Sequence, residues 1–164
     1  MARGNISVVS SGAGAAPTYK WQTEAAATAI YAGEPVKLKA AGSPYVIPCA
    51  DADLTLGTDV EFIGIAASDS TQTSALDGSI NVYIPLPGMI YEAKAKTAAS
   101  VDTQAEIDAL CGDRKIFDLT TGVYTVDEAA ADAVGNALLI IGGDPSKKTL
   151  KFIIDRGTNA VAGA

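Results

Sequence analysis

From Ile30 to Ile154, the chain consists of short apolar runs separated by residues that favour turns. The run over residues 79–86 is typical, because Ile80, Val82 and Ile84 recur at the period of two that places side chains on one face of a strand. Turn dipeptides such as Asp77-Gly78 and Thr121-Gly122 are typical of hairpin tips. This pattern predicts a mainly β fold. We expect about nine strands, over residues 35–39, 44–48, 61–66, 79–86, 89–94, 115–119, 123–126, 137–141 and 150–154.

One helix is expected within this series of strands. Thr103 can cap its N-terminus, Glu106 three residues later completes a capping box, and Gly112 can end it. The side chains expected to face the sheet are those of Ile107, Leu110 and Cys111. Residues 127–134 are rich in alanine and predict a second, short helical turn, and residues 142–145 (GGDP) predict a turn between two strands.

The length of 164 residues corresponds to one domain with a single core. Hydrophobic residues make up 48% of the chain but aromatic residues only 6%, so the core is built largely from small side chains. The expected fold is a single β-barrel, β-tulip-like or sandwich domain with one short helix and an extended N-terminal arm. We expect the arm to span residues 1–28, the β domain residues 29–156 and a flexible tail residues 157–164.

The N-terminal segment differs in charge from the rest of the chain. Before Glu24 its only charged residues are Arg3 and Lys20, whereas the whole chain has a net charge of −7. Glycine and serine residues are typical of a mobile tail, but apolar side chains alternate here as they do in strands. The alternating apolar residues are Ile6, Val8, Val9, Tyr19 and Trp21. This pattern favours an arm that becomes ordered against a partner with an acidic surface.

Composition excludes several classes of function. The chain has no histidine, which excludes the Ser-His-Asp triad and every metal site that needs an imidazole ligand. The negative net charge argues against nucleic acids and anionic membranes as partners, and no apolar run is long enough to span a membrane. Cys49 and Cys111 are expected to be small buried residues, although their pairing stays open. We therefore expect no catalytic residue, no metal and no cofactor.

Four segments resemble small capsid decoration (cement) proteins of tailed bacteriophages. They are residues 30–38 (IYAGEPVKL), 62–73 (FIGIAASDSTQT), 77–83 (DGSINVY) and 87–94 (PGMIYEAK), with weaker likeness over 112–119 and 142–144. The resemblance implies a β-barrel or β-tulip-like domain on the outside of an expanded icosahedral shell, often as trimers. It also implies a terminal arm that contacts the major capsid protein, and assembly in the cytoplasm of a bacterial host.

The expected function is therefore a non-enzymatic virion protein that stabilises the capsid. We expect its partners to be the major capsid protein and further copies of itself in a homotrimer. The residues expected to bind the capsid are Arg3, Ile6, Val8, Val9, Tyr19, Lys20 and Trp21. Two alternatives stay open. One is a carbohydrate- or host-binding β module on the virion surface, which would stack sugar rings on exposed aromatic side chains. The other is a component of a tail tube or collar.

Overall fold

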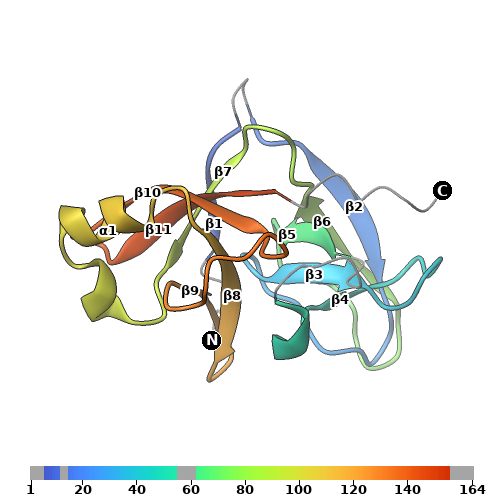
Figure 1. The fold of residues 1–164 in the computed structure, drawn as a ribbon. Helices are drawn as coiled ribbons and strands as arrows, with labels where there is room; N and C mark the ends of the chain where they lie inside the picture. The colour runs from blue at the N-terminus through green and yellow to red at the C-terminus, as the bar shows by residue number, and fades with distance from the viewer. Residues whose placement is uncertain (1–5, 12–14, 55–61, 156–164) are drawn as a thin grey trace.

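The computed structural model describes residues 6–11, 15–54 and 62–155, and Figure 1 shows their fold. Within these residues, the strands form two antiparallel sheets. In spatial order, the six-stranded sheet contains β1 (Ser7–Ser10), β7 (Ile90–Lys94), β11 (Thr149–Ile154), β10 (Leu138–Asp144), β8 (Arg114–Thr120) and β9 (Val123–Asp127). The five-stranded sheet contains β2 (Thr18–Thr23), β6 (Gly78–Tyr83), β5 (Phe62–Ala66), β3 (Pro35–Leu38) and β4 (Val46–Pro48).

The mainly β fold is confirmed, and the two sheets fit the sandwich form of the expectation. The described residues form no closed barrel, so that form of the expectation is wrong. The five-stranded sheet is curved enough for its two edge strands, β2 and β4, to approach each other. They are joined by an isolated parallel bridge between Gln22 and Tyr45 and do not pair as strands. No described strand therefore fills the seam between them along most of β2.

Two clusters of apolar side chains form the core. The larger one joins side chains from both sheets and from the helix, and Phe152 lies at its centre. The Phe152 ring stacks on Tyr91 at a centroid distance of 6.0 Å and meets Phe117 edge-on at 5.5 Å. The smaller cluster lies within the curved five-stranded sheet. Its buried members are Ile30, Val36, Val46, Ala66, Ile80 and Val82, and Trp21, Leu38, Ile63 and Ile84 pack against them.

The helix α1 (Gln104–Leu110) begins at the predicted capping box. The Thr103 Oγ1 accepts a hydrogen bond from the Glu106 backbone N–H, and the Glu106 side chain accepts one from the Thr103 backbone N–H. Ile107 is buried as expected, and Leu110 packs against the main core. Cys111 is exposed, so the expectation that it faces the sheet is wrong, whereas Cys49 is buried. The described residues also form two short 3₁₀ helices. They are η1 (Asp51–Asp53), after β4, and η2 (Ala98–Val101), just before α1.

The turns follow the sequence signals only in part. Thr121-Gly122 is a hairpin tip as predicted, and both residues have positive φ, 53° and 77°. Asp77-Gly78 is not a tip, because Gly78 already starts β6. The Asp77 carboxylate instead ties two loops together, accepting hydrogen bonds from the Ala25 backbone N–H and the Tyr45 hydroxyl, each at 2.8 Å. The Asp77 side chain thus forms tertiary contacts and does not stabilise a local turn.

Two further local expectations are wrong. Residues 127–134 contain the end of β9 followed by turns and irregular chain, and no helix, because an alanine-rich segment of this length does not sustain a helix alone. The turn predicted at residues 142–145 lies three residues later, at residues 145–148. Gly142 and Gly143 instead lie inside β10, next to a shift in the register of its pairing with β11. Gly143 is required there, since a Cβ at this position would lie 2.4 Å from the Thr149 carbonyl oxygen.

The described part of the N-terminal segment is extended, but it belongs to the body of the fold. The strand β1 pairs with β7 in one sheet, and β2 pairs with β6 over six residues in the other. The sequence boundary at residue 28 therefore does not separate an arm from a domain. The physical reason is that this chain itself supplies the apolar surfaces and strand edges that the segment covers.

Candidate interaction surface

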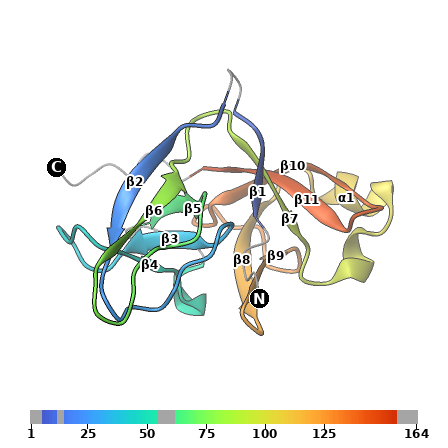
Figure 2. The same cartoon turned by 180° about the vertical axis from the view of Figure 1, so that it is seen from behind.

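The two longest stretches of the chain without a charged residue are residues 4–19 and 78–91. The structure brings them together. Val8 is opposite Tyr91 where β1 pairs with β7, and Tyr19 is opposite Val82 where β2 pairs with β6. Figure 2 shows both strand pairs, which together reach across the two sheets. We call the described residues of these two stretches the uncharged strip.

Several apolar side chains of the uncharged strip are exposed. Val9 is 46% exposed, Tyr19 57% and Leu86 42%. Tyr19 and Leu86 line one hollow, whereas Val9 lies on β1 in the other sheet. Exposed apolar side chains that gather around a hollow are typical of interaction sites on proteins. In a chain with a net charge of −7, a strip without carboxylates is also the surface that an acidic partner can approach with the least repulsion.

An open hollow of about 330 Å³ lies at one end of the strip, beside β2. We call it the β2 groove. Its lining consists of Tyr19, Lys20, Trp21, Ile84 and Leu86. Tyr19 and Trp21 are alternate residues of β2 and project to the same face, whereas Lys20 projects to the other. The groove therefore has an apolar wall, and the charge of Lys20 lies on the opposite face of the same strand.

Trp21 connects the groove to the smaller core cluster. It is half-buried and packs against that cluster, which fixes the position of the indole ring. Its Nε1 atom is buried and has no hydrogen-bond acceptor among the described residues. Lys20 is exposed and forms no ion pair with a described residue. Lys20 thus presents a positive charge that the described chain does not neutralise, on the face of β2 opposite Tyr19 and Trp21.

The residues expected to bind the capsid fall into three groups. Tyr19, Lys20 and Trp21 line the β2 groove together. Ile6 is only 5% exposed and belongs to the main core, and Val8 packs against that core, so neither offers much side-chain surface to a partner. Arg3 and Val9 complete the set: Arg3 lies outside the described residues, and Val9 is exposed on β1 in the other sheet.

Two groove residues, Ile84 and Leu86, were not predicted. Sequence periodicity placed them in a strand over residues 79–86, but β6 ends at Tyr83. The signal that could have found them is the pair of prolines Pro85 and Pro87, since proline has no N–H to donate to a strand partner.

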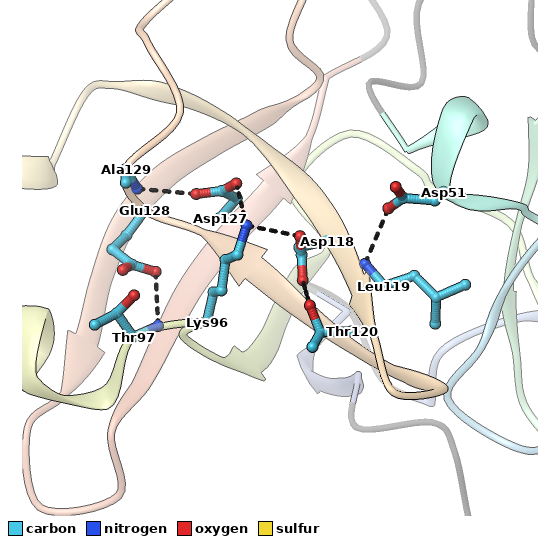
Figure 3. A network of polar contacts seen from close by, with 9 residues as sticks. All are labelled: Asp51, Lys96, Thr97, Asp118, Leu119, Thr120, Asp127, Glu128 and Ala129. Carbon is cyan, nitrogen blue, oxygen red and sulfur yellow. Dashed lines mark hydrogen bonds and ion pairs between the residues drawn. The ribbon is translucent and has the colours of Figure 1, made fainter.

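A second polar feature is an ion network at the β8–β9 hairpin (Figure 3). The Lys96 Nζ lies 2.8 Å from Asp118 Oδ1 and 3.0 Å from Asp127 Oδ2. Hydrogen bonds to Asp118 and Asp127 raise the pKa of Lys96. Burial opposes ionisation of Asp118, but hydrogen bonds from Lys96 and Thr120 outweigh it and hold the pKa of Asp118 below its ordinary value. The network thus favours the charged forms of Lys96 and Asp118.

The network fixes the segment that follows β7 against this hairpin. Backbone N–H groups extend it on both sides, with Leu119 donating to Asp51 Oδ1 at 3.3 Å and Thr97 donating to Glu128 Oε2 at 3.3 Å (Figure 3). Within the described residues, no three His, Cys, Asp or Glu side chains gather as metal ligands would. We interpret the network as a structural contact.

Comparisons with models of protein families, with curated proteins and with solved structures give no match. No helix among the described residues has the length and apolar character needed to cross a membrane. Any assignment of function therefore depends on the residues of this chain, and the β2 groove is a described surface with the properties of a binding site.

Proposed function

We propose that this chain is a non-enzymatic structural protein of a bacteriophage virion. It binds the outer surface of the capsid, as trimers, and stabilises the shell by bridging subunits of the major capsid protein. The proposal joins the resemblance of four segments to capsid decoration proteins with one structural observation, the uncharged strip and its groove. Assembly would take place in the cytoplasm of the bacterial host.

The uncharged strip supports this proposal because protein interfaces are depleted of charged residues at their centres and enriched in aromatic ones. Tyr19, Trp21 and Leu86 offer such a centre on an otherwise acidic chain. A partner that covers them buries apolar area without removing hydration water from carboxylates.

Stabilisation of the shell then follows from mass action. A protein that binds only the assembled shell lowers the free energy of the assembled state relative to the disassembled one. Each bridging copy holds two subunits at once, so contacts that are weak singly add up across the shell. This role needs no catalytic group.

The test is co-sedimentation of the purified chain with expanded capsid shells that lack a decoration protein. We expect the wild-type chain to saturate the shells and the double variant Tyr19→Ser/Leu86→Ser to bind at least tenfold more weakly. The matched control is Leu76→Ser/Val134→Ser, because these residues are also exposed, at 68% and 95%, but lie outside the groove. Failure of the wild-type chain to bind would overturn the proposal.

The groove also favours a second candidate, a carbohydrate-binding module on the virion surface. Tyr19 is an exposed aromatic side chain beside Trp21, and sugar rings stack on such surfaces. A glycan array distinguishes the two candidates. Binding to a defined glycan that is lost in Tyr19→Ser, together with no binding to shells, would favour this second function.

A further inference from the structure

The outer edge of β2 is a strand edge that no described strand pairs with. Among the described strands only β6 pairs with β2, and the other side of β2 has an isolated bridge from Gln22 to Tyr45, the residue before β4. On alternate residues from Thr18 to Trp21, backbone N–H and C=O groups therefore point away from β6 toward the open seam. An unpaired edge of this kind is a template for a further strand.

We propose that the β2 edge accepts an extended segment of another polypeptide as an added strand. This inference rests on the proposed function only for the identity of the partner, which would then be a capsid subunit. Pairing of main-chain groups provides the attachment, and the β2 groove provides pockets for alternate side chains of the incoming strand.

The groove also specifies the chemistry of that strand. Side chains of an added strand alternate between the two faces of the sheet, as those of β2 do. On one face they meet Tyr19 and Trp21, so apolar residues fit there. On the other face they meet Lys20, whose ammonium group has no partner among the described residues, so a carboxylate fits there. The occupant is an alternating apolar and polar strand with a central acidic residue.

The same charge disfavours a symmetric pairing of β2 with β2 of a second copy. In an antiparallel pair centred on this strand, the two Lys20 side chains would lie near each other on one face. A foreign acidic strand therefore fits the edge better than a second copy of the chain does.

The test uses two heptapeptides with blocked ends. Both have valine at the odd positions and threonine at the second and sixth, and the central residue is glutamate in one and lysine in the other. Each is titrated into the isotopically labelled full chain, and amide chemical shifts report both affinity and location. We expect the glutamate peptide to bind about threefold or more tightly than the lysine peptide. The shift changes should centre on Thr18–Trp21 and the paired residues of β6.

Lys20→Glu should reverse this preference. The control is Lys94→Glu, which makes the same charge change at another exposed strand lysine outside the groove, and should leave the preference unchanged. Absence of peptide binding, equal affinity for the two peptides, or shift changes centred on another strand would overturn the inference. The inference would also be overturned if the chain associates with itself and Tyr19→Ser abolishes that association, because a second copy would then occupy the edge.

These outcomes are separate from those of co-sedimentation. Shells that bind the wild-type chain while the peptides do not would overturn the added strand and leave the capsid proposal standing. Peptide binding at β2 without any binding to shells would do the reverse.

Discussion

At the scale of single residues, Thr23 stands out because its hydroxyl group contributes no hydrogen bond to the stability of the fold. It is fully buried at the end of β2, and its Oγ1 has no hydrogen-bond partner among the described residues. A buried hydroxyl that has lost its water contacts without a replacement destabilises the folded state. Thr149 is the contrasting case, since it is nearly as buried but its Oγ1 donates to Glu92 Oε1.

We expect Thr23→Val to raise the free energy of unfolding by about 1 kcal/mol, because valine keeps the branched shape and removes the unpaired hydroxyl. Thr149→Val should lower it by about the same amount, since it breaks a hydrogen bond and leaves Glu92 with one donor fewer. Urea unfolding followed by tryptophan fluorescence measures both. A loss of stability in Thr23→Val equal to that in Thr149→Val would show that the hydroxyl is satisfied.

At the scale of elements, the turn between β10 and β11 depends on one carboxylate. Asp144 Oδ1 accepts hydrogen bonds from the Ser146 hydroxyl at 2.6 Å and from the Ser146 backbone N–H at 3.0 Å. The hydroxyl of Ser146 is the largest cause that lowers the pKa of Asp144 to about 2. This turn therefore stabilises the fold only while the carboxylate is ionised.

This lowered pKa predicts an acid-sensitive turn. The stabilisation is complete above the ordinary pKa of 3.8 and is lost as the pH falls through about 2. In Ser146→Ala the pKa of Asp144 should return toward its ordinary value, so the variant should be less stable than wild type at pH 7. The difference should shrink below about pH 4 and vanish only below pH 2. Urea midpoints across this range give the difference. In the control Ser74→Ala, an exposed loop serine, any difference from wild type should not vary with pH.

Most elements could be predicted because each shows its own local pattern. All nine expected strands correspond to strands of the structure, and α1 begins at its capping box. The partner of a strand is a different matter. Alternation in residues 6–9 indicates that one face becomes buried, but not which surface buries it, and Ser7 meets Glu92 across a separation of 85 residues.

The same limit applies to the candidate site. Tyr19, Lys20 and Trp21 could be identified because they form an alternating aromatic pair around a positive charge in a segment with few charges. Ile84 and Leu86 complete the groove only because β2 pairs with β6, and that pairing is a property of the folded chain.

At the scale of the whole molecule, the N-terminal segment connects the two sheets. Its first strand closes one edge of the six-stranded sheet, and its second strand forms one edge of the five-stranded sheet. Ile6 and Val8 pack on the main core, whereas Trp21 packs on the smaller one. The two clusters are therefore linked through a segment that the sequence alone assigned to a separate arm.

We expect Ile6→Ala to lower the free energy of unfolding of the whole protein by about 2–5 kcal/mol, as for other buried aliphatic side chains. Val9→Ala is the control three residues later in the same segment, and it should cost less than about 1 kcal/mol because Val9 is half exposed. Thermal unfolding measures both. If residues 1–28 were a separable arm, Ile6→Ala would leave the transition of the domain unchanged.

The pairing of β1 with β7 also sets the order in which the chain can mature on the ribosome. Glu92 lies 85 residues after Ser7, and a ribosome takes about 4 to 17 s to synthesise this length at bacterial and eukaryotic elongation rates. During that time the first apolar segment has no partner, and it carries almost no charge to keep nascent chains apart. We therefore expect correct folding to depend on chaperones or on slow release of the chain from the ribosome. Where many ribosomes translate one messenger RNA, neighbouring nascent chains should aggregate more readily than they fold.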